Sequence, residues 1–270
     1  DYEEDEPRMF STVLLNAVCD GDKFKYAGVG AEENFYFPWR SDNYEEEDYE
    51  PEDATKDLFQ PETLMDIFNY FVFFTNKQKI VPRYMQYHAT NRIIERVEKG
   101  EPRKGLIWHT QGSGKSFTMI FTAYKAKRYF KKDTQYLIIV DRKKLEEQME
   151  DDLNAIDFPH FSKAESIEHL KELFEEGQRQ LILTTMQKFE DVPSDLEVDV
   201  DEPPLIMVDE CHRMTEGSLA SNLKAAIKDR FYFGFTGTPV KMGKTEKDRN
   251  TFREFSPDGE DYLHRYSLND

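Results

Sequence analysis

The residue types that could do chemistry are concentrated in a glycine-rich stretch that ends in Gly114-Lys115-Ser116. The stretch begins at His109 and lies between an apolar run, GLIWH, and a segment with helical periodicity. Glycines let backbone N–H groups approach phosphate oxygens, and the start of a helix favours anions. In such a loop the lysine contacts the β- and γ-phosphates of ATP and the next hydroxyl binds Mg²⁺. The predicted nucleotide-binding residues are Thr110, Gln111, Gly112, Ser113, Gly114, Lys115 and Ser116.

One position departs from the general phosphate-loop pattern, which has glycine where this chain has His109. The alternative is a Gly/Ser turn followed by a chance Gly-Lys-Ser. The apolar run directly before the loop and the helical pattern directly after it favour the phosphate loop.

A second group of chemically capable residues follows the aliphatic run LIMV, where Asp209 and Glu210 are adjacent. An acidic pair at the end of a buried strand is typical of the acidic motif in ATPases. Asp209 is predicted to bind Mg²⁺, and Glu210 to orient or deprotonate the attacking water. His212 is placed to sense the γ-phosphate, whereas Cys211 is expected to pack as a small apolar residue. Alone, the pair could be a solvated turn; its position after the phosphate loop favours catalysis.

A third motif, Thr236-Gly237-Thr238 followed by proline, comes after the apolar run FYFGF. By itself this segment is best interpreted as an ordinary Thr/Gly/Pro turn.

The elements that position these motifs alternate along the chain from residue 105 onward. Short aliphatic runs predict strands, and amphipathic segments of 10 to 15 residues between them predict helices. Continuously aliphatic strands that alternate with helices are typical of an α/β fold with a parallel sheet covered on both faces. The predicted strands are GLIWH, YLIIV, QLILTT, PLIMVDE and FYFGFT, and the predicted helices cover 116–130, 143–156, 166–176 and 218–228.

The first 80 residues have a different character. Residues 10–40 contain the strand candidates STVLLNAVCD, KFKYAGVG and NFYFPW, which predict a small β meander. Residues 41–58 are strongly acidic and read as a linker, and residues 59–80 begin with a helical pattern and predict a connector. A second amphipathic helix is expected over 82–100, with Gly100 ending it.

The charge of the chain is unevenly distributed. Its 270 residues carry a net charge of −18, which by itself argues against a nucleic-acid partner. Residues 1–60, however, hold 18 acidic and 5 basic residues, while the remainder holds 36 acidic and 31 basic residues. The larger part is therefore close enough to neutral to contact DNA. No apolar run is long enough for a membrane span, and two cysteines in this setting favour a cytoplasmic protein.

The order QGSGKS, DECH, TGTP resembles the first motor domain of superfamily 2 helicases and translocases. The stretches WHTQGSGKS, IIVDRKKLEEQ and TTMQKF resemble the R subunit of type I restriction endonucleases. The resemblance implies a RecA-like motor domain over 81–270, and a 1–40 remnant similar to the end of the family's nuclease domain. It also implies that Thr236, Gly237 and Thr238 couple ATP hydrolysis to DNA movement.

The same resemblance assigns further residues. Gln86 matches the glutamine that reads adenine, with Arg83 and Tyr84 supporting the base; the alternative is a solvated helix position. Arg142, Thr185 and Lys188 match segments that contact the phosphates of duplex DNA. For Arg142, which opens a predicted helix, a solvated helix face remains the alternative.

The family also implies parts that are not recognisable in these 270 residues. They are a nuclease site of the Asp…Glu-x-Lys type and a second motor domain that supplies an arginine finger. The chain is therefore expected to bind ATP–Mg²⁺ and to hydrolyse it very slowly alone, as part of a complex with specificity and methyltransferase subunits. The alternatives are a motor domain of another superfamily 2 helicase and a non-catalytic nucleotide-binding scaffold.

Overall fold

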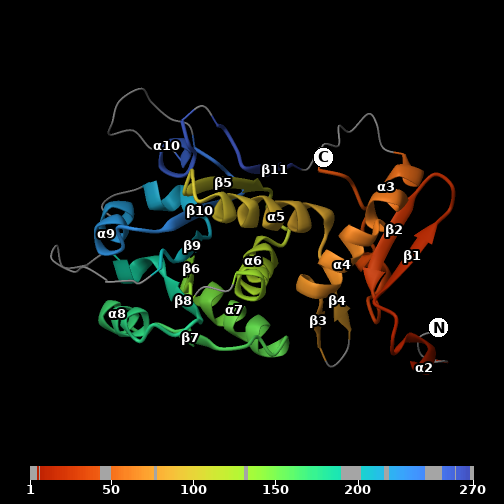
Figure 1. Cartoon of the computed structure of the whole chain (residues 1–270), viewed down its shortest axis with the longest axis horizontal. Coiled ribbons are helices and arrows are strands. Elements are labelled where there is room, and N and C mark those ends of the chain that lie inside the picture. The colour runs from red at the N-terminus through yellow and green to blue at the C-terminus, as the bar shows by residue number, and fades with distance from the viewer. Residues whose placement is uncertain are drawn as a thin grey trace. The chain divides into compact units, whose positions relative to one another are not determined.

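The computed structural model describes residues 5, 7–42, 50–75, 78–130, 133–189, 202–215, 219–240, 251–258 and 260–267. The chain divides into two compact units, Asp1–His88 and Ala89–Asp270 (Figure 1). The division falls inside one continuous helix, α5 (Tyr84–Lys99), whereas the sequence placed the start of the motor domain at residue 81. No helix among the described residues has the length and apolarity needed to cross a bilayer.

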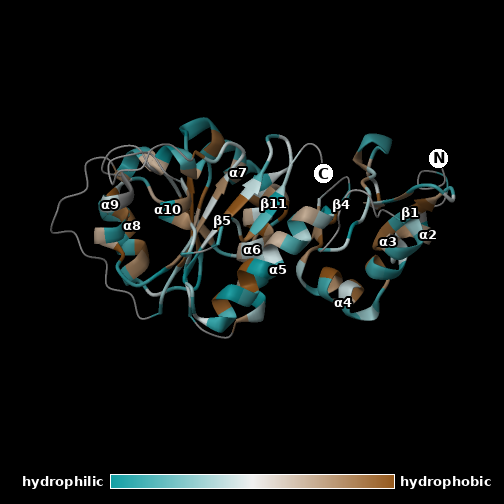
Figure 2. Ribbon diagram, turned by 90° about the horizontal axis from the view of Figure 1, so that it is seen from above, coloured by the Kyte–Doolittle hydropathy of each residue, from teal (hydrophilic) through white to brown (hydrophobic). Residues whose placement is uncertain are grey.

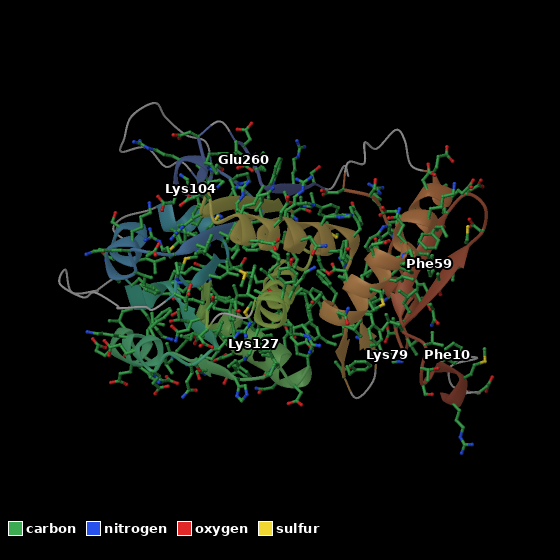
Figure 3. All side chains as sticks on the ribbon, viewed as in Figure 1. Phe10, Phe59, Lys79, Lys104, Lys127 and Glu260 are labelled. Atoms are coloured by element: carbon green, nitrogen blue, oxygen red, sulfur yellow. The ribbon has the colours of Figure 1, made fainter. Side chains whose placement is uncertain are left out.

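The first unit is built from short elements. Its antiparallel hairpin joins β1 (Leu15–Cys19) and β2 (Phe24–Gly28), and a second small hairpin joins β3 (Phe73–Phe74) and β4 (Lys79–Ile80). Lys79 holds the N-terminal segment, because its ammonium donates to the carbonyl of Phe10 at 3.2 Å (Figure 3). The remaining elements are α2 (Pro7–Phe10), the 3-10 helix η1 (Glu33–Phe35), α3 (Pro51–Leu58) and α4 (Pro61–Tyr70).

Three expectations for this unit are corrected. The strand predicted in STVLLNAVCD forms as β1, but none of its residues is buried, whereas four of the five residues of its partner β2 are buried. The segment NFYFPW forms η1 and a single bridge from Phe37 to Tyr26 in place of a full strand. Within the predicted linker 41–58, residues 43–49 lie outside the described residues, and the last eight residues form α3. That helix is stabilised by burial of Ala54 and Leu58 on one face, with Glu52 and Asp53 exposed.

The second unit contains a seven-stranded sheet in which all pairings between the described strands are parallel. The order is β11-β5-β10-β9-β6-β8-β7, so the strand before the phosphate loop and the strand before the acidic pair are separated by one strand. The strands are β5 (Lys104–His109), β6 (Tyr136–Val140), β7 (Phe161–Lys163), β8 (Leu181–Thr185), β9 (Leu205–Val208), β10 (Phe231–Thr236) and β11 (His264–Tyr266).

Helices cover both faces of this sheet. As a consequence, every residue of β6, β8, β9 and β10 is buried. One face shares a core with α8, α9 and α10, through alternate residues such as Leu137 and Ile139. Figure 2 shows apolar residues gathered on the central strands and polar residues on the outer helix surfaces. The helices are α6 (Lys115–Tyr129), α7 (Lys143–Ala155), α8 (Ile167–Glu175), α9 (Leu219–Ala226) and α10 (Thr251–Phe255), with the 3-10 helices η3 (Met186–Phe189) and η4 (Cys211–Thr215).

The predicted α/β, RecA-like class is confirmed, as are the five aliphatic strands and the four helices between them. Gly100 ends α5 with φ of +82°, as expected of a helix stop. The edge strands β7 and β11 and the helix α10 were not predicted. Each is short and only partly apolar, and the two strands are defined by pairing with distant segments of the chain.

Candidate functional site: a phosphate loop facing an acidic strand end

The phosphate loop connects the buried strand β5 to helix α6, which begins at Lys115. Gly112 and Gly114 have φ of +83° and +81°, a left-handed backbone that other residues rarely adopt. Gly114 is the residue that caps α6, so the turn of N–H groups that lacks intrahelical partners lies at the loop itself. These features are those of an anion-binding helix start.

The acidic pair lies opposite this loop, at the end of the buried strand β9. Asp209 is 6% exposed, and among the described residues its Oδ1 is buried without a hydrogen-bond partner. Burial, and then the neighbouring Glu210 carboxylate, raises the pKa of Asp209 to about 6, although Lys115 opposes the shift. A buried carboxylate oxygen that lacks a partner fits a ligand of a divalent cation.

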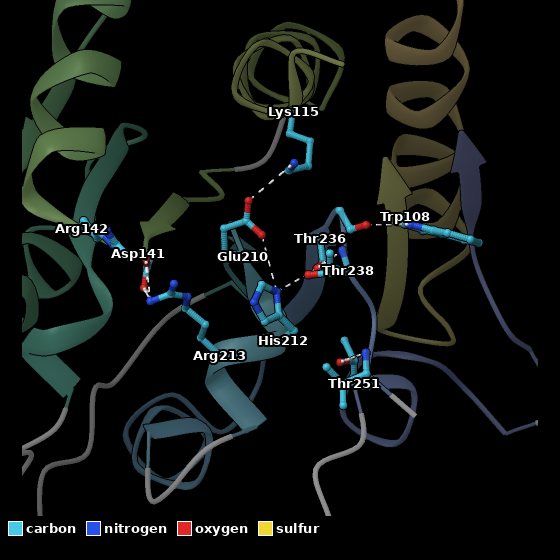
Figure 4. A network of polar contacts seen from close by, with 12 residues as sticks. Trp108, Lys115, Asp141, Arg142, Glu210, His212, Arg213, Thr236, Thr238 and Thr251 are labelled. Atoms are coloured by element: carbon cyan, nitrogen blue, oxygen red, sulfur yellow. Dashed lines mark hydrogen bonds and ion pairs between the residues drawn. The ribbon is translucent and has the colours of Figure 1, made fainter. Parts of the chain in front are cut away.

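Glu210 joins the two sides of the site. Its Oε1 lies 3.6 Å from the Lys115 ammonium, and its Oε2 lies 3.5 Å from Nδ1 of His212 (Figure 4). Its φ of +44° is uncommon for a residue with a side chain, and such strain is retained mainly at functional sites. The backbone therefore aims this carboxylate between the phosphate loop and the third motif.

The third motif follows β10, the strand between β5 and β9. The ring nitrogen Nδ1 of His212 lies 2.9 Å from the hydroxyl of Thr236, which also accepts a hydrogen bond from the N–H of Thr238 at 3.0 Å. The carbonyl of Gly237 accepts a hydrogen bond from the Trp108 indole at 3.1 Å (Figure 4). Lys115, Glu210, His212 and Thr236 are thus one series of polar contacts across three neighbouring strands.

Known proteins resemble this chain in sequence over most of its length. The family model described as SWI2/SNF2 ATPase matches residues 85–270. The chain belongs to the SWI2/SNF2 ATPase family. The predicted resemblance is confirmed at that level, and the curated relatives are endonuclease subunits of type I restriction enzymes.

One relative is a Methanocaldococcus jannaschii protein described as the MjaVIIIP endonuclease subunit, 32% identical over 99% of this chain and 29% of the relative. Another is the HindI endonuclease subunit of Haemophilus influenzae, 26% identical over 100% of this chain and 28% of the relative. The chain therefore spans less than a third of the length of these relatives. A solved Sulfolobus solfataricus SWI2/SNF2 ATPase core in complex with double-stranded DNA has 19% identity and a TM-score of 0.48, covering 64% of this chain and 35% of that one.

His109, where the phosphate-loop pattern has glycine, is an internal residue of this SWI2/SNF2 ATPase domain. It is fully buried, and its Nε2 lies 2.8 Å from Nδ1 of His264 on β11. Burial, and then the nearby Lys115 ammonium, lowers the pKa of His109 to about 3, so the ring is neutral at ordinary pH. His264 could not be predicted as its partner, because β11 itself was not predicted.

Gln86 lies in the first unit, on the opening turn of α5, and not in the unit that carries the phosphate loop. It is 5% exposed, so it is not the solvated helix position considered as its alternative. Its Oε1 accepts a hydrogen bond from the backbone N–H of Arg83 at 2.8 Å. The side chain is therefore held in a fixed orientation.

The three residues expected to contact DNA lie at the carboxyl ends of β6 and β8 or directly after them. Arg142 is the most accessible, with a side chain 64% exposed, and its Nε lies 3.0 Å from a buried carboxylate oxygen of Asp141. Thr185 is buried. Lys188 lies 2.9 Å from Oε1 of Glu146, and its side chain is only 16% exposed. Lys188 therefore has a structural partner inside the domain.

Sequence reasoning missed Arg213, which lies on η4 directly after the acidic motif. Its guanidinium lies 3.2 Å from Asp141 Oδ2, and its side chain is 44% exposed. Asp141 thus forms ion pairs with two arginines at the strand ends, Arg142 directly before α7 and Arg213 on η4. Arg213 is visible in the sequence as the last residue of DECHR, but its partner Asp141 could be identified only from the fold.

Proposed function

We propose that this chain is the ATP-binding motor domain of a type I restriction endonuclease subunit, and that it uses ATP–Mg²⁺ to act on duplex DNA. One observation carries the proposal: Lys115 at the start of α6 faces Glu210 at 3.6 Å, next to the buried, unpartnered Oδ1 of Asp209. The residues present fit the nucleotide and its metal. A cation, a carboxylate and a left-handed glycine loop are brought to one edge of the sheet, as phosphoryl transfer requires.

Each residue has a role in this proposal. Lys115 and the N–H groups of residues 110–116 hold the phosphates, while Ser116 and Asp209 hold Mg²⁺. Glu210 orients or deprotonates the attacking water, and His212 passes the state of the site to Thr236. Mg²⁺, when bound, neutralises charge on the phosphoryl group that is transferred. Gln86 reads adenine.

The DNA-binding part of the proposal is carried by Arg142, with Thr185 and Lys188 at the same sheet edge. We propose that Arg142 contacts a backbone phosphate, since it is the exposed cation of the three. Lys188 acts in this proposal mainly by holding the segment after β8 through Glu146. Backbone contacts carry no sequence information, so specificity and methyltransferase subunits would select the DNA site.

The rest of the enzyme is proposed to lie outside these 270 residues. The relatives are more than three times as long as the matched region, which leaves room for a nuclease and a second motor domain. The isolated chain is then expected to bind nucleotide but to turn it over very slowly. DNA-stimulated turnover by the chain alone, at the rate of a complete motor, would contradict this division.

The nucleotide site is tested with Lys115→Ala and a matched control. Lys127→Ala is the control, since Lys127 lies on the same helix and donates to the carbonyl of Pro159 at 2.7 Å (Figure 3). Titration calorimetry with Mg²⁺–ADP should show at least a roughly tenfold loss of affinity for Lys115→Ala, because charge-assisted hydrogen bonds to phosphate are strong. Lys127→Ala should bind as the wild type does.

The same variants separate the alternatives in the full-length protein. Wild-type DNA-dependent activity in Lys115→Ala would favour a nucleotide-binding scaffold over a motor. Strand separation coupled to ATP hydrolysis would favour another kind of superfamily 2 helicase. DNA-stimulated ATPase without strand separation supports the translocase proposed here.

A further inference from the structure

The turn that carries Gln86 is held by more than its own helix. Residues 82–86, the Gln86 turn, precede and open α5, and Gln86 Oε1 accepts from the N–H of Arg83 at 2.8 Å. The N–H of Gln86 in turn donates to the carbonyl of Arg83 at 2.9 Å. The first of these bonds is the half of a capping box in which the side chain of the third helical residue accepts from the N–H of the residue before the helix. The direction of the Gln86 amide therefore depends on where the backbone of Arg83 lies.

Two aromatic residues from the segment 24–40 contact this turn. The hydroxyl of Tyr26 donates to the carbonyl of Pro82 at 2.5 Å. The guanidinium carbon of Arg83 lies 3.7 Å from the centroid of the Phe37 ring, a close cation–π stack. Both contacts lie within the first unit, and they fix the two residues that come directly before the opening turn of α5.

Tyr26 and Phe37 also pair with each other in an isolated antiparallel bridge, the Tyr26–Phe37 bridge. Each donates its backbone N–H to the other's carbonyl, at 2.9 and 3.0 Å. Tyr26 is 2% exposed and packs its ring against the fully buried Trp39 at 5.5 Å. The Tyr26–Phe37 bridge is therefore part of the core of the first unit. Through its contacts with Pro82 and Arg83 it restricts the positions of these two residues.

On the basis of the proposed adenine-reading role of Gln86, we propose that Tyr26 and Phe37 are positioning residues for base selection. A hydrogen-bonding site discriminates between bases only when its donor and acceptor are held within a fraction of an ångström. The Tyr26–Phe37 bridge restricts the position of the Gln86 turn and so of the Gln86 amide, while the phosphate groups are held by other residues. The segment that resembles the tail of a nuclease domain would then serve nucleotide recognition.

The test compares adenine with cytosine nucleotides, because a loss of fold would weaken both and a loss of positioning only one. Mg²⁺–ADP and Mg²⁺–CDP are titrated calorimetrically into the intact chain. Phe37→Leu removes the ring face under Arg83 but keeps an apolar side chain at a half-buried position. We expect it to lower ADP affinity about fivefold, the size of one lost cation–π contact, and to leave CDP affinity unchanged.

The matched control is Phe59→Leu, the same substitution in the same unit. The Phe59 ring packs on Phe24 at 6.2 Å and is 42% exposed (Figure 3). This variant should keep the wild-type ratio of ADP to CDP affinity. Tyr26→Phe is the second positioning variant: it keeps the buried ring, removes the hydrogen bond to Pro82, and should lower the ratio in the same direction.

Gln86→Ala separates this inference from the function on which it rests. It should abolish the preference for ADP, and Phe37→Leu should then have no further effect, since both act through one side chain. If Gln86→Ala keeps the preference, its adenine-reading role is wrong and the inference falls with it. If Gln86→Ala loses the preference but Phe37→Leu and Tyr26→Phe keep it, or lower ADP and CDP affinity equally, the inference alone is overturned.

Discussion

Replacing Lys188 by alanine should destabilise the second unit, because this lysine neutralises a carboxylate that is almost fully buried. The Glu146 side chain is 3% exposed, and its Oε1 lies 2.9 Å from the Lys188 ammonium. The same ammonium donates to the carbonyl of Ala164. Removing one partner of a buried ion pair typically costs about 3–5 kcal/mol. Since Lys188 keeps some contact with solvent, we expect the lower end, about 3 kcal/mol.

Thermal unfolding of the intact chain measures this loss. For a unit of this size, 1 kcal/mol shifts the Tm by about 2–4 °C, so Lys188→Ala should lower it by about 6–12 °C. Arg142→Ala is the matched control, since Arg142 also pairs with a carboxylate, at 3.0 Å, but with a side chain 64% exposed. Because Arg142 is itself exposed and the buried Asp141 carboxylate keeps Arg213 as a partner at 3.2 Å, the loss should be at most about 1 kcal/mol, and the Tm should fall by no more than about 4 °C.

A double-mutant cycle decides whether the buried charge is the cause. With Glu146→Gln in place, no carboxylate remains to be neutralised, and Lys188→Ala should cost less than about 1 kcal/mol. Equal Tm shifts for Lys188→Ala and Arg142→Ala would refute the reasoning, as would a double mutant that shows the sum of the single effects. If the buried charge is the cause, a loss of DNA binding in Lys188→Ala would reflect reduced stability of the unit as well as a lost contact between Lys188 and DNA.

Three other substitutions test the packing and electrostatics around the site. Gly234→Ala should cost about 1–3 kcal/mol in urea unfolding, because its Cβ would lie 2.6 Å from a ring carbon of Phe255; wild-type stability would contradict this. Burial holds the pKa of His109 near 3, below its usual 6.5, so the unfolded chain binds more protons between these values and His109 stabilises less as the pH falls. The stability difference between wild type and His109→Gln should therefore change between pH 7 and pH 5, and a constant difference would count against it. Trp108→Phe removes the hydrogen bond to Gly237 and should cost about 1 kcal/mol; an unchanged Tm would mean that the bond contributes nothing.

The parts of the fold that could be predicted are those whose signal is local. Five strands were visible because a strand buried on both faces must be aliphatic along its whole length, as YLIIV and LIMV are. The edge strands β7 (FSK) and β11 (HRY) have no such run, since an edge strand needs only one partner and tolerates polar side chains. The helix α3 was hidden by its acidic residues, although Ala54 and Leu58 have the spacing of a buried helix face.

The site shows the same limit. The positions of Lys115, Asp209 and Glu210 in the fold could be predicted, because Lys115 begins a helix and the acidic pair directly follows a strand that the sequence reveals. Their side-chain partners were not predictable, since the partners are far apart in sequence: 42 residues separate Lys188 from Glu146, and 155 separate His109 from His264. Such pairs depend on strand order, for which this sequence contains no local signal.

The strand order also explains why the third motif can serve the other two. In a parallel sheet the carboxyl ends of all strands meet at one edge, so neighbouring strands bring their following loops together. Because β10 lies between β5 and β9, its Thr236 is next to both the phosphate loop and the acidic pair. The acidic motif reaches Thr236 through His212 at 2.9 Å, and the strand before the phosphate loop reaches Gly237 through Trp108 at 3.1 Å. A turn held from both sides in this way is positioned for the coupling role proposed for Thr236, Gly237 and Thr238.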